Sequence, residues 1–318
     1  MFICFKKKYL LFFIYIAILI NINYNYNYRF KCEDCIFMKN IRKKCYKCSY
    51  EILLKNISVL SVEQTLNEII KKNKSIARFG DGEFDIIFGL NRKLQQYNIT
   101  LKEKLLKVLN SNMSNLLIGI MPLTNIKNKF WINYLEKNKF RLSKVINKNK
   151  VYYSSMITRF YHSKKNKTKI NEYITKFKSI WNNRNILIIE GEKTRLGIGN
   201  NLFNNSKSIK RIICPIANSF RVYNKILEFT KNLTLDKNTL ILISLGQTAT
   251  ALTYDLQNLG NQIIDFGHFD IQYEYFLRNV TQSIRIPYKF VNEVKDGGKN
   301  IISITDNNYY KQIIYKIE

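Results

Sequence analysis

Acidic residues are scarce in this sequence. The 318 residues include 23 aspartates and glutamates against 52 lysines and arginines, which gives a formal net charge of +29 at pH 7. Glycine, proline and tryptophan are also scarce, at 12, 3 and 2 residues, whereas lysine, asparagine, isoleucine and tyrosine crowd the chain, as an AT-rich coding sequence would produce. The basic residues are scattered through polar stretches such as KKNK and KKNKTK, so we assign most of them to a solvated surface. A phosphate-bearing ligand would still benefit from the excess positive charge.

The apolar content excludes an intrinsically disordered chain. Apolar residues make up 46% of the sequence, and 318 residues can build one large domain or two small ones around a buried core. Changes in composition divide the chain into an N-terminal part (1–24), a cysteine-containing stem (25–60) and a C-terminal domain (61–318).

The N-terminal part lacks a small-residue cleavage site. Its apolar run, YLLFFIYIAILI at 9–20, follows three lysines at 6–8 and has the length of a signal-peptide core. We therefore predict an uncleaved signal-anchor helix in residues 1–24, with Tyr24, Tyr26 and Tyr28 at the membrane interface. This predicts a single-pass membrane protein whose C-terminal domain is lumenal, as in the endoplasmic reticulum or Golgi. The alternative is a buried element of a cytoplasmic protein.

Four of the six cysteines are grouped in the stem. Cys32, Cys35, Cys45 and Cys48 have the spacing C-x2-C-x9-C-x2-C, which supplies the ligands of a tetrahedral Zn²⁺ site. In an oxidising lumen the same cysteines would instead form two disulfides, and the sequence leaves the two alternatives open. Cys214, in the apolar segment RIICPI, is expected to be a small buried residue.

The part from Ser61 to Glu318 has a regular α/β pattern. Ser61 and Gln64 have the spacing of a capping box at the start of a helix. Continuous apolar runs, typical of buried parallel strands, occur at 75–79, 115–120, 185–190, 211–216, 239–244 and 262–266. Helical patterns separate them, as in TATALTYDLQNLG at 248–260. The alternation predicts a Rossmann-like, mostly parallel sheet with flanking helices, in which ligands bind at the carboxyl ends of the strands.

Polar, glycine-containing loops follow these strands. They contain Asp81 and Glu83 in a GDGE turn, Arg195, Gly197, Gly199 and Asn200 after Glu190, Gly246 and Thr248 after Ser244, and His268 and Asp270 after Phe266. Glycines let a backbone approach a phosphate closely, arginine matches phosphate oxygens, and helix N-termini bind anions. Because the chain has only two histidines, one at a strand end is a notable candidate. Ordinary turn chemistry explains each loop alone, but together they indicate a ligand site.

Several long motifs resemble the GT-D glycosyltransferase family. They are RFGDGE, EGEKTRLGIGNNLF, IKRIICPIANSF, LGQTATALTYDL and DFGHFDIQYEYF, and they occur in order between about residues 61 and 294. Two positions depart from the family pattern: Asn201 follows Asn200 where Asp is usual, and Tyr275 stands where Trp is usual. These changes concern the donor sugar or the acceptor, since the acidic motif is intact. The N-terminal part and the cysteine cluster lie outside the resemblance, which otherwise describes mainly cytoplasmic bacterial proteins.

The resemblance implies a Rossmann-like enzyme that uses a UDP-sugar and a divalent metal, Mn²⁺ or alternatively Mg²⁺, held at an Asp-x-Glu motif. That motif falls on Asp81 and Glu83, which would be both metal ligands and catalytic residues. His268 or Asp270 would supply a base for the acceptor hydroxyl. The expected nucleotide-binding residues are Arg78, Gly80, Gly82, Glu190, Arg195, Gly197, Gly199, Asn200, Gly246 and Thr248.

The predicted function is metal-dependent transfer of a sugar, such as the hexose of a UDP-hexose, to a glycan or glycoprotein acceptor. A carboxylate-held ion suits this reaction because the departing diphosphate needs its charge stabilised. Two alternatives remain. One is a non-catalytic nucleotide-binding protein, and the other is a basic zinc-knuckle protein that binds nucleic acid. The favoured prediction includes the membrane, through the N-terminal segment, and does not include a nucleic-acid partner.

Overall fold

The computed structural model describes residues 50–51, 53–124, 126–161, 167–280 and 282–318. By its contacts the chain divides into residues 1–46 and 47–318. The predicted anchor helix and the four-cysteine cluster therefore lie outside the described residues. Within the described ranges, no helix has both the length and the apolar character needed to cross a membrane.

The described residues form one nine-stranded sheet in the order β1-β4-β3-β2-β8-β7-β5-β6-β9. Its neighbouring strands are parallel. The strands are β1 (Ser58–Val59), β2 (Ser75–Arg78), β3 (Leu116–Ile120), β4 (Val151–Ser154), β5 (Asn185–Gly191), β6 (Ser208–Cys214), β7 (Leu240–Ser244), β8 (Ile263–Asp265) and β9 (Ile313–Lys316). The predicted Rossmann-like, mostly parallel sheet is confirmed.

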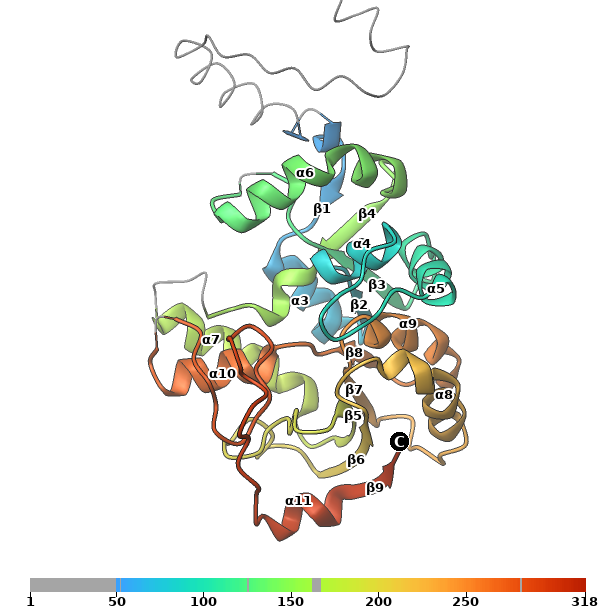
Figure 1. Ribbon diagram of the computed structural model, residues 1–318. Helices are drawn as coiled ribbons and strands as arrows, with labels where there is room; N and C mark the ends of the chain where they lie inside the picture. The colour runs from blue at the N-terminus through green and yellow to red at the C-terminus, as the bar shows by residue number, and fades with distance from the viewer. Residues whose placement is uncertain (1–49, 52, 125, 162–166, 281) are drawn as a thin grey trace, which may run out of the picture. The chain divides into compact units, whose positions relative to one another are not determined.

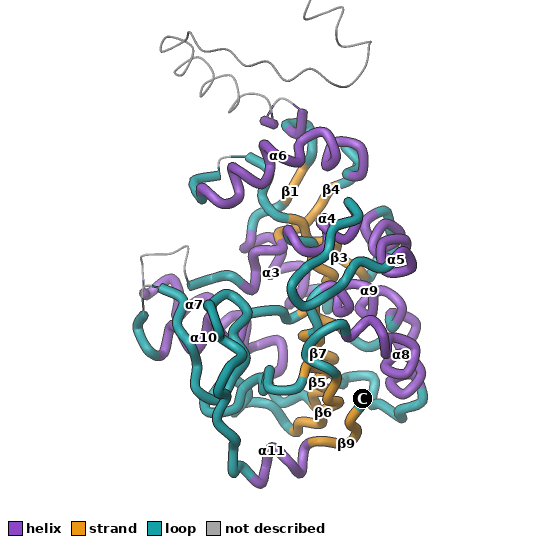
Figure 2. Tube along the Cα trace, viewed as in Figure 1, coloured by secondary structure: helices purple, strands orange, loops and turns teal. Residues whose placement is uncertain are grey.

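Helices cover both faces of the sheet (Figures 1 and 2). They are α3 (Val62–Lys71), α4 (Asp81–Ile87), α5 (Ile99–Leu109), α6 (Lys129–Val145), α7 (Lys167–Lys178), α8 (Tyr223–Lys231), α9 (Gln247–Asp255), α10 (Phe269–Leu277) and α11 (Asn307–Gln312). One hydrophobic cluster joins α4, α5, α6, α8 and α9 to the sheet, and a second joins α3, α7 and α10. The strands are thus buried on both faces, as their unbroken apolar runs predict.

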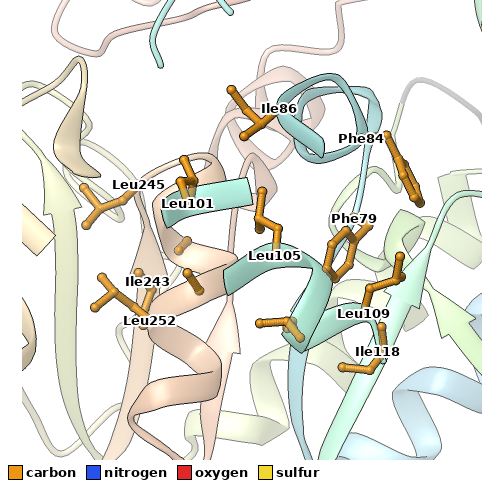
Figure 3. Packing of buried hydrophobic residues seen from close by; sticks show 14 of the residues in the cluster. Phe79, Phe84, Ile86, Leu101, Leu105, Leu109, Ile118, Ile243, Leu245 and Leu252 are labelled. Carbon is orange, nitrogen blue, oxygen red and sulfur yellow. The ribbon is translucent and has the colours of Figure 1, made fainter. Parts of the chain in front are cut away.

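Alternate strand residues contribute to the two clusters. In β5, Leu187 belongs to the first cluster and Ile188 to the second, because successive side chains of a strand point to opposite faces. In Figure 3, Leu105 of α5 lies within the first cluster, between the buried residues of β3 and of α9. Cys214 is 1% exposed and packs in the same cluster, which confirms the prediction of a small buried residue.

Capping explains where two of the helices begin. Ser61 and Gln64 form the predicted capping box of α3, in which each side chain bonds the backbone of the other residue. The GDGE segment is not a loop turn, contrary to the prediction, because its last three residues begin helix α4. Gly80 is the N-cap and its N–H donates to Oε2 of Glu83 over 2.7 Å. Acidic residues also interact favourably with the positive end of the helix dipole.

Strands β2 and β8 are neighbours in the sheet although they are far apart in sequence. Helix α4 follows β2 and packs in the first hydrophobic cluster, whereas α10 follows β8 and packs in the second. The chain therefore leaves these two strands toward opposite faces. Such a switch point opens a crevice at the carboxyl ends of the strands, where α/β proteins usually bind their ligands.

Candidate active site

Three acidic residues lie on the short helix α4 at this switch point. Asp81 and Asp85 are one helical turn apart, and the guanidinium of Arg92 bridges them. Nη2 donates to Oδ2 of Asp81 over 2.7 Å and Nη1 to Oδ2 of Asp85 over 2.8 Å. Asp85 and Arg92 are absent from the sequence-based site. The i, i+4 spacing of the two aspartates was a usable signal for Asp85, since residues so spaced share a helical face.

Glu83 lies in the same turn and is 9% exposed. Burial raises the pKa of its carboxyl to about 7, and the charges of Asp265 and Asp81 act in the same direction. The hydrogen bond from Gly80 opposes this shift but does not cancel it. Near neutral pH the Glu83 carboxyl is therefore about half protonated, and a nearby cation would favour its ionised form.

Tyr134 connects α6 to the start of α4, where Asp81, Glu83 and Asp85 lie; we term this segment the acidic turn. Its hydroxyl lies 2.9 Å from Oδ1 of Asp85 and 3.2 Å from the backbone oxygen of Asp81. Burial raises the pKa of Tyr134, and the negative charge of Asp85 adds to the effect. The neutral phenol is thus retained as a hydrogen-bond donor. This contact places the start of α6 beside the two aspartates.

Arg78 has a structural role in this arrangement. Nε donates to the backbone oxygen of Asp265 over 2.7 Å, Nη2 to its Oδ1 over 3.0 Å, and Nη1 to Oγ1 of Thr158 over 2.7 Å. A Cβ at Gly267 would lie 1.9 Å from Nη2, so the glycine makes room for the guanidinium. Arg78, expected to bind nucleotide, therefore ties the ends of β2, β4 and β8 together.

His268 lies at the start of α10 beside Arg159, which sequence analysis missed because β4 is short and weakly patterned. Nη2 of Arg159 lies 3.2 Å from Nδ1 of His268, and Nε2 of His268 lies 3.6 Å from Oε1 of Glu293. Arg159 also pairs with Glu293. Because a guanidinium only donates hydrogen bonds, Nδ1 is the acceptor and the proton of the neutral ring is on Nε2.

Burial and two neighbouring arginines keep the imidazole of His268 neutral. Burial, together with the positive charges of Arg159 and Arg78, lowers the pKa of the imidazole well below its usual value. Burial and the charge of Arg78 also lower the pKa of Arg159 to about 10, so Arg159 remains a cation at neutral pH. The charges of Asp81 and Glu83 partly oppose this lowering of the pKa of Arg159.

The start of α9 contacts the acidic turn directly. A Cβ at Gly82 would lie 2.0 Å from Nε2 of Gln247, so this glycine permits the close approach of the two helices. Gly246 has a φ of +54°, a conformation that favours glycine, and precedes the helix. Thr248 is fully buried and lies 3.3 Å from Gln95. Gln247 is thus partly exposed and lies against the buried Gly82, whereas the Thr248 side chain faces the protein interior.

The loop after β5 is fixed by a buried ion pair. Glu190 accepts from Nη1 of Arg211 over 2.5 Å and from the backbone N–H of Leu196 over 2.7 Å, with both charged residues at most 1% exposed. Arg195 donates from Nη1 to the backbone oxygens of Tyr288 and Ile302 over 2.7 and 2.8 Å. Through these contacts, Glu190 and Arg195 position the loop.

Asn200 and Asp270 belong to a second buried polar cluster. Asp270, 0% exposed, accepts from Nζ of Lys289 over 2.6 Å, from the backbone N–H of Gly197 over 3.0 Å and from Asn200 over 2.9 Å. Lys289 and Asn200 also bond Glu274. Asp270 is thus enclosed, whereas His268, two residues earlier, borders the acidic crevice.

The two glycines of this loop have steric roles. A Cβ at Gly197 would lie 2.3 Å from the ring of Phe203, and one at Gly199 would lie 2.6 Å from the ring of Tyr288. Both glycines also have a φ of +75°. Together with Asn200 they line a cavity of about 410 Å³. The sequence-based site is therefore split: Asp81, Glu83, Gly82, Gly246 and His268 lie around the switch point, and the loop of residues 190–200, in which Gly199 is exposed, is joined to the buried Asp270 through Gly197 and Asn200.

The donor set suits a hard divalent cation with few protein ligands. Asp81 and Glu83 offer carboxylate oxygens, which Mg²⁺ and Mn²⁺ prefer. Within the part of the chain that the structure describes, no group of three or more histidines, cysteines or acidic residues is placed to hold a metal. A bound ion would take its remaining ligands from substrate phosphates and water, as is usual for Mg²⁺.

Fold and site together define a Rossmann-like protein with a polar site at the switch point of a parallel sheet. The family described as Glycosyltransferase GT-D fold matches residues 76–294, and the chain belongs to this family. It is 33% identical over 268 residues to a probable glycosyl transferase, Gly, of Streptococcus gordonii and 31% identical over 289 residues to glycosyltransferase GlyD of Streptococcus pneumoniae. These matches cover 82% and 88% of this chain but only 39% and 35% of those proteins.

Solved structures with the same fold support the assignment. The domain of unknown function 1792, described as having a distinct glycosyltransferase fold, matches with a TM-score of 0.80 and 31% identity, over 86% of this chain and 100% of that chain. A glycosyltransferase with this domain from Streptococcus sanguinis matches with a TM-score of 0.76 and 30% identity, over 82% of this chain and all of that one. The family expected from the sequence motifs is confirmed.

Proposed function

We propose that this protein transfers a hexosyl group from a UDP-sugar to a glycan or glycoprotein acceptor, with Mn²⁺ or Mg²⁺ held by Asp81 and Glu83. The observation that carries the proposal is the position of Asp81 and the buried Glu83 in the first turn of α4, directly after β2 at the sheet's switch point, and the raised pKa of Glu83 supports it. A buried carboxylate in a ligand crevice is a typical feature of a functional site. Membership of a glycosyltransferase family supports the reaction class.

Two positive groups would stabilise the charge of the diphosphate: the metal ion and the guanidinium of Arg159. A divalent ion, when bound, stabilises the negative charge of the departing diphosphate as a Lewis acid. Arg159 supplies a guanidinium on the His268 side of the site and matches phosphate oxygens. Arg195 is the alternative for this role; its Nη1 bonds two backbone oxygens and so positions the loop, whereas Arg159 is paired with the side chains of Glu293 and His268.

His268 changes role with the position of Arg159. While Arg159 donates to Nδ1, the neutral ring has no free basic nitrogen and can only donate from Nε2. When Arg159 turns to the diphosphate, Nδ1 becomes available to accept the proton of the acceptor hydroxyl. Burial and the charges of Arg159 and Arg78 lower the pKa of the imidazole, so the ring is neutral before this step. Its basicity rises when the Arg159 charge moves to the diphosphate. Asp270 is enclosed by Lys289, Gly197 and Asn200, so His268 is the better candidate for the base.

The direct test measures UDP release from a panel of UDP-sugars by the purified full chain, with and without Mn²⁺. We expect metal-dependent hydrolysis or transfer, and at least an approximately hundredfold loss in Asp81→Asn, since Lewis-acid stabilisation supplies several kcal/mol. Circular dichroism checks that this variant is folded. UDP binding without turnover would establish a non-catalytic nucleotide-binding protein, and steeply salt-dependent binding of nucleic acid alone would favour the zinc-knuckle alternative.

The membrane topology forms a separate part of the proposal. Residues 1–24 would anchor the protein and the catalytic domain would be lumenal, with Cys32, Cys35, Cys45 and Cys48 as two disulfides or as Zn²⁺ ligands. Asn56 and Asn232 are exposed and lie in N-x-S/T sequences, so they can report the compartment in a eukaryotic host. Glycosidase-sensitive gel mobility supports the lumenal location. An unglycosylated, protease-sensitive domain with four free thiols would contradict it.

A further inference from the structure

The first turn of α6 presents aromatic rings next to the acidic turn. Phe130 is 55% exposed, and its ring centroid lies 5.2 Å from that of Trp131 at an interplanar angle of 77°. The Trp131 ring lies 5.9 Å from that of Tyr134, also edge to face. Phe130 and Tyr134 are nearly parallel, at 20° and 6.3 Å. The three residues form a ridge of rings with differently oriented faces, which we term the aromatic ridge.

The capping of α6 fixes this ridge in place. Oδ1 of Asn128 accepts from the backbone N–H groups of Phe130 and Trp131 over 2.9 and 3.3 Å. This is an N-cap, so the first turn and its side chains are held by the helix itself. Tyr134 is anchored by Asp85 and by the backbone of Asp81. The aromatic ridge is therefore continuous with the first turn of α4.

Exposure of an apolar side chain on its own is not informative, because single exposed hydrophobic residues are normal. Phe140 illustrates this on the same helix. It is 63% exposed and has no aromatic neighbour among the described residues. The aromatic ridge differs in being clustered, capped and bonded to two residues of the acidic turn.

The charges beside the ridge indicate which ligand suits it. Pyranose rings have an apolar C–H face that packs on an aromatic face, and hydroxyl edges that donate hydrogen bonds. Binding sites commonly combine aromatic walls with a few polar groups in this way. Asp85 is buried and already accepts from Tyr134 and Arg92. The side chain of Asp81, whose backbone oxygen Tyr134 contacts, is instead 26% exposed, and its carboxylate can accept from sugar hydroxyls. The diphosphate is assigned to the metal ion and to Arg159, so the ridge is left to a neutral ring.

We propose that the aromatic ridge binds a pyranose ring of the acceptor glycan and thereby presents its hydroxyl to the acidic turn. This inference rests on the proposed glycosyl transfer for its biological meaning. Binding of a neutral sugar at the ridge can nevertheless be measured without any turnover.

The experiment compares the full chain with Phe130→Ala and Trp131→Ala, using Phe140→Ala as the matched control on the same helix. Each protein is applied to an array of neutral oligosaccharides, and the glycans it retains are then titrated in solution. Trp131 and the fully buried Trp181 are the two tryptophans, so a sugar on the ridge changes the fluorescence of Trp131. A parallel titration with UDP and Mn²⁺ measures the nucleotide site.

We expect saturable sugar binding to the wild type and to Phe140→Ala, and binding weaker by at least about tenfold, or 1.4 kcal/mol, in Phe130→Ala and Trp131→Ala. UDP affinity should change less than about twofold in these variants. No retained glycan, or equal affinities in all four proteins, would overturn the proposal. Loss of binding to anionic phospholipid vesicles in Phe130→Ala without any sugar binding would also overturn it, and would identify a membrane contact. Failure of UDP-sugar turnover alone would refute the proposed function and leave the sugar titration interpretable.

Discussion

Arg92 and Asp81 form an ion pair at the mouth of the candidate metal site, with 2.7 Å between Nη2 and Oδ2. The other Nη of Arg92 bonds Asp85, so one arginine neutralises part of the charge of two carboxylates. Burial works against the charge of Arg92, but the two aspartates outweigh it and raise the pKa of the guanidinium. A metal ion at Asp81 must therefore compete with this arginine.

Removing the competing cation should strengthen metal binding. We expect Arg92→Ala to bind Mn²⁺ about tenfold more tightly in the absence of nucleotide, as measured by isothermal titration calorimetry. Lys104→Ala is the matched control, because Lys104 pairs with Asp255 in a comparable ion pair elsewhere. Weaker Mn²⁺ binding by Arg92→Ala would mean instead that Arg92 orients Asp81 for the metal.

The raised pKa of Glu83 predicts a pH-dependent stability. A carboxyl with a folded-state pKa of about 7 holds its proton more tightly than in the unfolded chain, where the pKa is about 4.3. Stability is therefore lost as pH rises between these two values. Glu83→Gln should remove this loss, because a glutamine oxygen can still accept from Gly80.

In the presence of EDTA, we expect Glu83→Gln to be more stable than the wild type at pH 8, by about 2 to 3 kcal/mol, and similar to it at pH 4. Urea unfolding at the two pH values measures the difference. A stability difference that is the same at both pH values would show that Glu83 does not titrate in this range.

We expect substitution of Arg159 and of Arg195 to affect UDP affinity differently. Arg159→Ala should weaken UDP binding by roughly 1.5 to 3 kcal/mol, the range for a hydrogen bond to a charged group. Arg195→Ala should lower the melting temperature and leave UDP affinity unchanged, because Arg195 links the backbones of Tyr288 and Ile302. Calorimetric titration with UDP distinguishes the two. The reverse result would restore Arg195 to the nucleotide site that the sequence motifs suggest.

Asp270 should act on stability. Asp270→Asn leaves the fully buried Lys289 with Glu274 as its remaining acidic partner, so we expect a loss of about 3 to 5 kcal/mol. Adding Lys289→Met should restore part of this loss, because the buried cation is then removed as well. Urea unfolding of the single and double variants checks both statements. A fully stable but inactive Asp270→Asn would indicate a catalytic role instead.

The sequence by itself determined the sheet and the location of the acidic motif. Unbroken apolar runs such as 185–190 mark strands that are buried on both faces, and this property belongs to the local segment. The capping box of Ser61 and Gln64 is equally local, since its partners are three residues apart. The acids Asp81 and Glu83 were found because they directly follow a strand. Their helical conformation was missed, since GDGE carries the composition of a turn.

Only the tertiary structure decided which polar residues face the ligand crevice. Arg78 has the sequence context of a phosphate ligand, but it bonds Asp265, which lies 187 residues further along the chain. Asp270 is likewise enclosed by Lys289. Burial and long-range pairing set the charge and the freedom of each group, and both depend on where distant segments meet. A local motif can therefore predict a helix cap or a strand, whereas the roles of Arg78, Arg159 and Asp270 follow from the packing of β2, β4 and β8.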